Sequence, residues 1–152
     1  PPAIEVDPAL NFESLAVSHL ASSGALDDLV CDEAQFYTDS QVEQLARVVD
    51  EMDVDVYAFG LLTDFRGKLF PGSARLLEIA DQRHELQVQA RCWCGEPATH
   101  NARLHDGVQV YDGDVVLIDD GSTAKVTYEL RCRNHWISGQ AGPIADRYKA
   151  AG

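Results

Sequence analysis

The chain has 152 residues, of which 45% are hydrophobic, and its 25 acidic against 12 basic residues give a formal net charge of −13. This length and apolar content are enough for one folded domain with a small appendage, and they exclude a disordered chain. An acidic surface repels phosphate backbones and anionic lipid head groups, so we expect neither nucleic acid nor a membrane as a partner. A small nucleotide stays compatible, because local groups and metal ions override the global field.

The sequence shows no apolar run of about 18 residues and no signal peptide, which leads us to expect a cytoplasmic protein. The first residue is Pro1 and not an initiator Met, so we expect a processed or truncated start. In a reducing compartment, the four cysteines favour metal binding over disulfides.

The first part of the chain alternates helices and strands. Residues 13–23 predict a short helix that Gly24 closes, and residues 29–31 predict a buried strand that ends at acidic residues. A capping box at residues 38–41 opens an amphipathic helix, and residues 54–59 predict a second strand. A strand, a helix and a strand in this order predict a βαβ unit with parallel strands and a right-handed crossover.

The chain changes character near Arg91. Before it, we predict a helix that follows Pro71-Gly72-Ser73 and ends at about Asp81, and a third strand around Leu86, Val88 and Ala90. After it, short β runs are predicted at residues 108–111, 115–118 and 125–130, with hairpin turns at Asp106-Gly107, Asp112-Gly113 and Asp120-Gly121. We therefore divide the chain into an α/β core at 1–90, a β-rich module at 91–136 and a tail at 137–152 that is a loose helix or disordered.

Two pairs of metal-ligating residues flank the predicted hairpins: Cys92 with Cys94, and Cys132 with His135. Three thiolates and an imidazole suit tetrahedral Zn²⁺, and a module of about 45 residues has too little core to be rigid without such a staple. Four protein ligands leave no open position, so we expect a structural ion. The alternative is buried cysteines and a surface His135. The other histidines have no such company: His19, His84, His100 and His105.

Asp32 and Glu33 directly follow the first predicted strand. Nucleotide-binding α/β folds place their ligands at the C-terminal ends of strands, where an Asp can hold Mg²⁺ and a Glu can accept a proton from a hydroxyl. Gln35 and Phe36 add an amide and an aromatic ring suited to a base. Acidic residues in turns and helix caps give the same pattern, so spacing alone leaves both interpretations open.

Several unrelated short motifs agree in order with one family. They are Asp32-Glu33-Ala34-Gln35-Phe36, Gly60 to Phe65, Phe70-Pro71-Gly72-Ser73, Cys94-Gly95 with Ala98-Thr99 and Arg103, and Tyr128 with Cys132 to His135. Over residues 29–136, the sequence resembles the type II thymidine kinases, particularly the bacterial ones. The resemblance implies a partial RecA-like P-loop kinase core, followed by a small β-rich zinc-ribbon or lasso module that closes over thymidine.

The resemblance also implies an activity and its residues. The activity is transfer of the γ-phosphoryl group of ATP, with Mg²⁺, to the 5′-hydroxyl of thymidine, in deoxynucleoside salvage for DNA synthesis, by a homotetramer. Asp32 resembles the Walker B acid for Mg²⁺ and Glu33 the general base. Ala34 and Gln35 would complete the nucleotide-binding turn. Phe36, Phe65, Phe70 and Tyr128 would contact the nucleoside; plain core packing is the alternative for Phe65 and Phe70.

The sequence departs from the family at three places. No G-x-x-x-x-G-K-[ST] motif occurs; Gly67-Lys68 is followed by Leu69. Without such a phosphate cradle, we expect these 152 residues alone to be inactive. Ile118-Asp119 replace paired lasso glycines, and Asn101 stands where the family often has Thr. The alternatives are a non-catalytic, zinc-stabilised nucleoside-binding or assembly module, and a kinase for another nucleoside.

Overall fold

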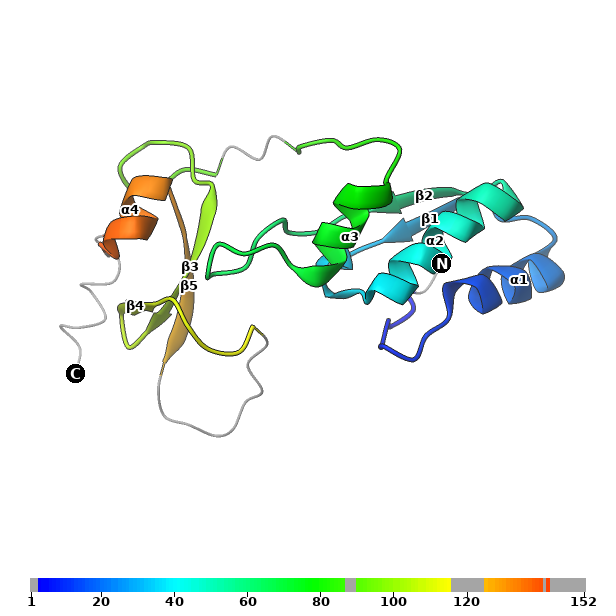
Figure 1. Cartoon of the computed structure of the whole chain (residues 1–152), viewed down its shortest axis with the longest axis horizontal. Helices are drawn as coiled ribbons and strands as arrows, with labels where there is room; N and C mark the ends of the chain where they lie inside the picture. Colours follow the sequence, from blue (N-terminus) through cyan, green and yellow to red (C-terminus); the bar gives the residue numbers. More distant parts are fainter. Residues whose placement is uncertain (1–2, 87–89, 116–124, 141, 143–152) are drawn as a thin grey trace. The chain divides into compact units, whose positions relative to one another are not determined.

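The computed structural model describes residues 3–86, 90–115, 125–140 and 142, and the chain forms two compact units (Figure 1). The first unit comprises residues 1–62 and 69–84, and the second comprises residues 63–68 and 85–152. The short segment Thr63–Lys68 thus packs with the second unit, although residues of the first unit flank it in sequence. The functional division at residues 91 and 137 stays a prediction. In the part that the structure describes, no helix is long and apolar enough to cross a membrane.

The first unit contains a two-stranded parallel sheet with helices. Asp28 pairs with Asp55 at one end of β1 and β2, and Cys31 pairs with Ala58 at the other. The prediction of parallel strands is therefore confirmed. The elements are α1 (Phe12–Ser23), β1 (Asp28–Cys31), η1 (Ala34–Phe36), α2 (Asp39–Met52), β2 (Asp55–Ala58) and α3 (Pro71–Ile79).

The ends of these helices follow the expected local chemistry. The side chain of Asn11 accepts the N–H of Ser14 at 2.8 Å to begin α1, and Gly24 ends it with a φ of 77°. Thr38 and Gln41 form the predicted capping box at the start of α2. Helix α3 is confirmed, but it begins at Pro71 and not after Ser73, and it ends two residues before the predicted position.

An apolar core holds the first unit together. Helix α2 turns its apolar stripe inward, so that Val42, Leu45 and Val48 are each at most 3% exposed. Fully burying a side chain of this size stabilises the fold by about 1.5–3 kcal/mol. Two clusters of buried residues make up this core: Phe12, Cys31, Ala34, Tyr37, Val42 and Leu45, and Ala16, Val48 and Val54.

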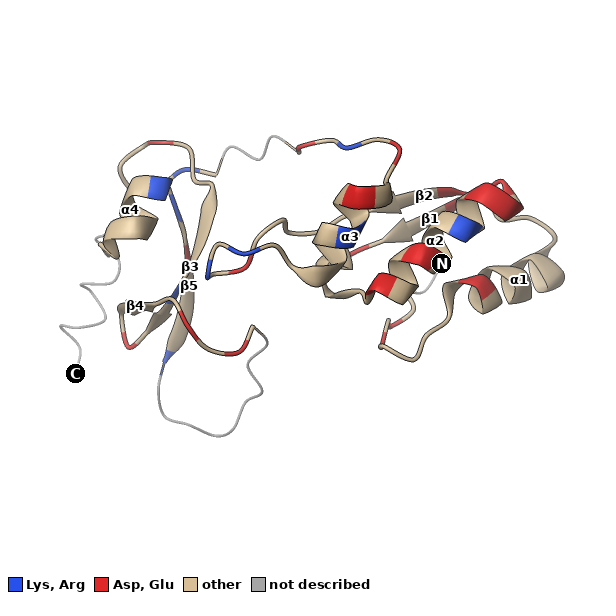
Figure 2. Cartoon of the chain, in the orientation of Figure 1, with Lys and Arg blue, Asp and Glu red and all other residues tan. Residues whose placement is uncertain are grey.

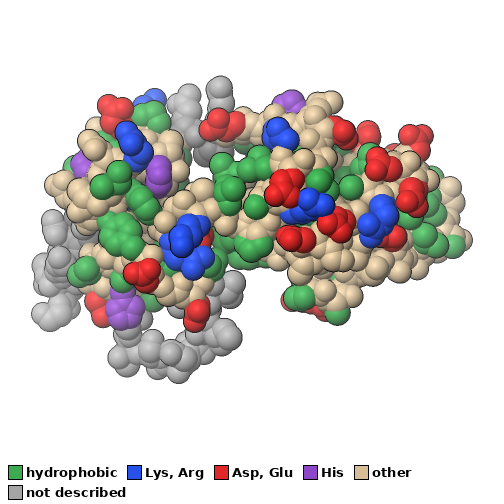
Figure 3. Space-filling model, viewed as in Figure 1, with side chains coloured by type: hydrophobic (Ala, Val, Ile, Leu, Met, Phe, Trp, Pro, Cys, Tyr) green, Lys and Arg blue, Asp and Glu red, His purple; other side chains and the backbone are tan. Residues whose placement is uncertain are grey.

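The surface of the first unit is strongly acidic. Acidic residues recur along α2 and also lie on α1, β2 and α3 (Figure 2), and the space-filling view shows basic side chains among them (Figure 3). Arg75 illustrates this arrangement, because its guanidinium lies 2.8 Å from Glu43 and 2.7 Å from Glu78. Exposed pairs of this kind contribute little to stability, so the unit depends on its core.

The second unit contains an antiparallel sheet in the order β4-β3-β5, followed by a short helix. The turn between β3 and β4 has positive φ angles at Asp106 (49°) and Gly107 (78°), as a two-residue hairpin requires. The predicted hairpin at this position is confirmed. The elements are β3 (His100–His105), β4 (Val108–Val110), β5 (Val126–Arg131) and α4 (Arg133–Ser138).

Strand β3 and helix α4 were not predicted. Strand β3 carries no β-branched residue, and Ala102, Arg103 and Leu104 are all buried, so the apolar-polar alternation of a half-buried strand is absent. Helix α4 has six residues, too few to show a helical period.

Other predictions fall wholly or partly outside the described residues. Of the proposed third strand, 87–89 lie outside, and Leu86 and Ala90 belong to no strand. The predicted run at 115–118 lies outside from residue 116 onward, and so do Ile118-Asp119 and the turn at Asp120-Gly121. The predicted hairpin at Asp112-Gly113 needs this run as its second strand, so it stays a prediction. Most of the tail, 143–152, is outside as well.

Candidate functional site

Four potential metal ligands meet in the second unit. Cys92, Cys94, Cys132 and His135 each offer one ligand atom, and these atoms all lie within 4.8 Å of one another. Nδ1 of His135 is 3.3 Å from Sγ of Cys92 and 3.4 Å from Sγ of Cys132. The Sγ atoms of Cys94 and Cys132 are 3.9 Å apart. The structure thus brings together the four residues that the sequence singled out.

Local backbone geometry explains why each pair converges. At the first pair, the N–H of Cys92 donates to the carbonyl of Glu96 at 2.9 Å, and the N–H of Gly95 donates back to the carbonyl of Cys92 at 2.8 Å. Gly95 has a φ of 90°, which favours glycine and lets the chain turn within these few residues. At the second pair, Cys132 precedes α4, so one helical turn places His135 beside it.

The geometry and chemistry of this cluster fit zinc. With Zn–S near 2.3 Å and Zn–N near 2.0 Å, a tetrahedral ion separates two sulfur atoms by about 3.8 Å, and sulfur from nitrogen by about 3.5 Å. The observed 3.9 Å between sulfur atoms and 3.3–3.4 Å from sulfur to nitrogen are close to these values. Four protein ligands leave no place for substrate or water, so the cluster is compatible with a structural Zn²⁺ ion.

The thiol of Cys92 is prepared for metal binding. Burial opposes its ionisation, but hydrogen bonds from the backbone of Cys94 and Cys132 and from His135 outweigh this effect and lower its pKa to about 6. Cys31, in the core of the first unit, shows the opposite behaviour, because burial raises the pKa of its thiol. Thiolates are the form that binds zinc, so the lowered pKa of Cys92 suits a metal ligand and the raised pKa of Cys31 suits a core residue.

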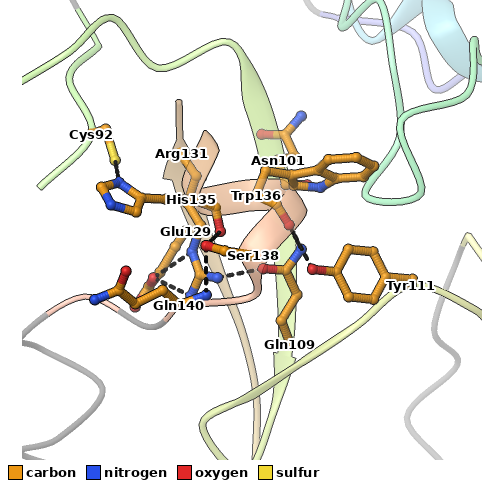
Figure 4. A network of polar contacts seen from close by, with 10 residues as sticks. All are labelled: Cys92, Asn101, Gln109, Tyr111, Glu129, Arg131, His135, Trp136, Ser138 and Gln140. Carbon is orange, nitrogen blue, oxygen red and sulfur yellow. Dashed lines mark hydrogen bonds and ion pairs between the residues drawn. The ribbon is translucent and has the colours of Figure 1, made fainter. Parts of the chain in front are cut away.

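A polar network supports the cluster (Figure 4). Arg131 is fully buried, and its Nε and Nη2 atoms donate to the carboxylate of Glu129 at 3.1 and 2.8 Å. Its Nη1 atom donates to the amide oxygen of Gln109, whose Nε2 atom donates to the carbonyl of Trp136 at 3.0 Å. This network joins β5, β4 and α4, the helix that carries His135.

In the first unit, Asp32 and Glu33 are exposed directly after β1, as predicted. Glu33 has left-handed backbone angles, φ 52° and ψ 32°, and its N–H donates to the carboxylate of Asp32 at 2.8 Å. The buried amide of Gln35 donates to the carboxylate of Glu33 and accepts the N–H of Leu61 at 3.0 Å. Gln35 therefore orients Glu33 and ties it to the segment that follows β2.

Two glycines allow the segments around this acidic turn to pack closely. A Cβ atom at Gly72 would lie 2.4 Å from the carbonyl oxygen of Ala34, and one at Gly60 would lie 2.5 Å from Oε1 of Gln35. The hydroxyl of Ser73 donates to the carbonyl of Leu61 at 2.6 Å. These contacts account for two of the short motifs, because they seat the start of α3 against η1.

Four aromatic residues singled out by the sequence fall into two pairs. In the first unit, Phe36 and Phe70 meet edge to face with their centroids 5.5 Å apart; Phe36 is 54% exposed and Phe70 is buried. In the second unit, the guanidinium of Arg103 lies 3.7 Å from the ring centroid of Phe65 and 5.4 Å from that of Tyr128. Its Nε atom donates to the hydroxyl of Tyr128 at 2.9 Å. Arg103 thereby holds the second pair together.

Sequence reasoning missed the residues that support the metal cluster. Gln109, Arg131 and Trp136 were not singled out, and Arg103 was only part of a motif. Gln109 lies 22 residues from its partner Arg131 and 27 from its partner Trp136, so no local pattern marks these contacts.

Comparisons with known proteins agree with the resemblance. The family model described as thymidine kinase matches residues 6–136. A thymidine kinase of Cutibacterium acnes is 51% identical over 94% of this chain and 67% of its own length. One of Streptomyces coelicolor is 52% identical over 88% of this chain and 62% of its own length. The chain belongs to the thymidine kinase family.

The match to this family is broad but covers only part of each relative. A thymidine kinase of Legionella pneumophila is 45% identical over 75% of this chain and 52% of its own length. The chain thus spans between about half and two thirds of the length of these curated relatives. The matched region of the family model contains the acidic turn, both aromatic pairs and the metal cluster.

Proposed function

We propose that the protein containing this chain is a thymidine kinase that transfers the γ-phosphoryl group of ATP to the 5′-hydroxyl of thymidine. The observation that carries the proposal is the oriented Asp32-Glu33 turn at the end of a parallel strand, in a chain of this family. Ligands of α/β folds lie at such strand ends. The strand pairing is compatible with a partial RecA-like core. The proposed role is deoxynucleoside salvage for DNA synthesis, in a cytoplasmic homotetramer.

The two acidic residues would divide the work. Phosphoryl transfer depends on positioning and on charge neutralisation. Glu33, whose carboxylate is exposed and held by Gln35, would accept the proton of the 5′-hydroxyl. Asp32 would hold Mg²⁺ directly or through water. The turn that includes Ala34 and Gln35 would keep this acidic pair in place beneath the nucleotide.

The aromatic residues would provide the contacts to the nucleoside. Phe36 and Tyr128 are more than half exposed, so their rings are available for stacking on a base or sugar. Phe70, at 7% exposure, packs against Phe36 in the first unit, and Phe65, at 3% exposure, lies under Arg103 in the second. They would form the apolar walls behind these contacts. Neither nucleic acid nor a membrane is proposed as a partner, because the net charge of −13 opposes both.

The bound Zn²⁺ would supply no chemistry and would hold the fold of the second unit. The residues that would hold it are Cys92, Cys94, Cys132 and His135.

The test of the proposal uses the full-length protein with a phosphate-binding loop, because these 152 residues carry no G-x-x-x-x-G-K-[ST] motif. We expect the full-length protein to phosphorylate thymidine and Glu33→Gln to lower kcat by about 10²- to 10⁴-fold, as loss of a general base does. Glu51→Gln, an exposed change on α2, is the matched control. Thymidine turnover equal in both variants would refute the role of Glu33, and turnover by the 152 residues alone would refute the need for the loop.

A non-catalytic nucleoside-binding or assembly module is the second candidate. The observation that favours it is Ile118-Asp119, in place of the paired glycines that the resemblance leads us to expect. Thymidine binding without any ATP turnover by the full-length protein would support it. Faster turnover of another nucleoside than of thymidine would instead indicate a different substrate.

A further inference from the structure

The indole of Trp136 bridges two segments of the second unit. Its Nε1 atom donates to the carbonyl oxygens of Phe65, at 3.1 Å, and Asn101, at 3.0 Å. Phe65 lies 71 residues earlier in the chain, within the segment Thr63–Lys68. Trp136 also directly follows the metal ligand His135 in helix α4. One side chain therefore joins the metal-binding helix to a segment that carries a proposed nucleoside contact.

The segment Thr63–Lys68 is a compact loop with its own hydrogen bonds. The N–H of Asp64 donates to the carbonyl of Lys68 at 2.8 Å, and the N–H of Gly67 donates to the carbonyl of Asp64 at 3.0 Å. The buried carboxylate of Asp64 accepts the N–H groups of Arg66 and Lys68 at 2.9 and 3.1 Å. A loop braced in this way moves as one piece, so an attachment at one point positions all of it.

The loop rests directly on the indole ring. Gly67 has a φ of 73°, and a Cβ atom there would lie 2.9 Å from Cη2 of Trp136. The amide of Asn101 adds a bond to the carbonyl of Thr63 at 3.3 Å. The backbone of the loop is therefore held from Trp136 and β3, while Arg103 covers the ring of Phe65.

Trp136 is itself fixed by the surrounding fold. Its carbonyl accepts hydrogen bonds from Nε2 of Gln109 at 3.0 Å and from the hydroxyl of Tyr111 at 2.6 Å (Figure 4). Its ring packs edge-on against Tyr111, with centroids 5.5 Å apart, and tilted against His100, at 4.9 Å. The backbone N–H of Trp136 donates to the carbonyl of Cys132 at 2.9 Å, which links Trp136 to the metal cluster.

We infer that Trp136 is a positioning residue that holds the loop Thr63–Lys68, and with it Phe65, and that it makes the order of this loop depend on metal binding. When Zn²⁺ joins Cys132 and His135 to Cys92 and Cys94, it fixes α4 and hence the indole. The indole then fixes the loop. The consequence for thymidine rests on the proposed function, but the link from metal to loop does not.

Hydrogen exchange of the peptide that contains residues 63–68 tests both steps of this link: removal of zinc should raise the exchange, and so should the Trp136 variants in the zinc-loaded protein. We expect Trp136→Phe, which removes the N–H donor, to raise exchange in this peptide by about three- to tenfold, the effect of one lost hydrogen bond. Trp136→Leu should raise it further. Trp93→Phe is the matched control, because Trp93 stacks on His135 with centroids 4.1 Å apart, whereas the described hydrogen bonds to the loop come from Trp136 and Asn101.

Two further variants keep the test decisive. Gly67→Ala pushes on the indole from the loop side without touching the metal ligands, and it should raise exchange in the same peptide. In the double variant of Gly67→Ala with Trp136→Phe, exchange in this peptide should rise by less than the two single effects combined, because both substitutions disturb the same contact. Zinc content is measured in every sample. Unchanged exchange at residues 63–68 in zinc-loaded Trp136→Leu would overturn the inference, as would an equal rise in Trp93→Phe.

A second readout joins the loop to the substrate. In the full-length protein, Trp136→Phe should raise the KM for thymidine by about three- to tenfold with a smaller change in kcat, because the lost bond displaces a binding residue. If the unaltered full-length protein has no thymidine kinase activity, the proposed function fails while the exchange result still decides the link. If KM stays unchanged although exchange rises, the loop is held by Trp136 but does not position a thymidine contact, and that part of the inference is overturned.

Discussion

Different forces stabilise each of the two units of this chain. The first unit has an apolar core of Val, Leu, Phe and Tyr side chains beneath α1 and α2, with capped helices around it. The second unit buries two arginines, Arg103 and Arg131, and gathers three cysteines and a histidine at one point. The first unit is therefore stabilised by burial, whereas the second combines satisfied buried polar groups with a cluster that is compatible with a structural metal ion.

Removing a metal ligand should produce the largest difference between the units. Cys132→Ser removes a ligand and loosens α4, so we expect zinc to be lost and the second unit to unfold, because structural zinc supplies about 10–16 kcal/mol of apparent binding energy in small domains. Protease digestion followed by mass spectrometry should find new cuts in residues 63–68 and 90–140, and none in α1, α2 or β1. His105→Ala, an exposed change in the same unit, is the control. Full zinc content in Cys132→Ser would contradict the proposed role of Cys132 as a zinc ligand.

Breaking the buried polar network should have the next largest effect. Arg131→Met leaves Glu129 and Gln109 without their partner, and we expect a loss of about 3 kcal/mol in the second unit. This value is the low end of the roughly 3–5 kcal/mol that is lost when a buried ion pair is broken, because the Glu129 side chain keeps 22% exposure. Urea unfolding measured by Trp fluorescence checks this, since both tryptophans lie in this unit. The double variant Arg131→Met with Glu129→Met should recover part of the loss; no recovery would mean that packing matters more than charge.

A cavity created in the core of the first unit should destabilise that unit alone. Leu45→Ala removes a side chain that is 3% exposed, and we expect a loss of about 2–5 kcal/mol. Hydrogen exchange should rise over residues 12–58 and stay unchanged in the metal-binding segments. Equal destabilisation of both units would show that they unfold together, and the contrast between them would then fail.

The smallest expected effect is the loss of one helix cap. Thr38→Ala removes the side-chain acceptor of the N–H of Gln41 and should lower the stability of the first unit by about 1 kcal/mol. Thr38→Ser keeps the acceptor and should stay within about 0.5 kcal/mol of the original residue. Thermal unfolding of both variants measures this difference; a ranking in which Ser is as poor as Ala would argue against the capping box.

The sequence predicted the first unit better than the second, and the forces explain why. In α2 the apolar residues recur at helical spacing, and the capping box is a local motif, so both can be read from a few neighbours. In β3 both faces are covered and a buried arginine lies between Ala102 and Leu104, so no period appears. Asp32 and Glu33 were found because acidic residues end an apolar strand. Trp136 was missed because its partner, Phe65, is 71 residues away.

The metal-ligand cluster could be predicted from the sequence for a different reason. Cys92 and Cys94 form one short local pair, Cys132 and His135 form another, and both pairs consist of residue types that bind zinc. The network that supports this cluster has no such signature, since Arg, Gln and Glu occur on every protein surface.

The most direct test of this account is hydrogen exchange of the whole chain before and after removal of zinc with a chelator. Zinc should be present at one ion per chain, and its removal should raise exchange at residues 90–115 and 125–140, and at 63–68, while the peptides of α1, α2 and β1 keep their protection. A metal-free protein with full protection in both units would contradict the account.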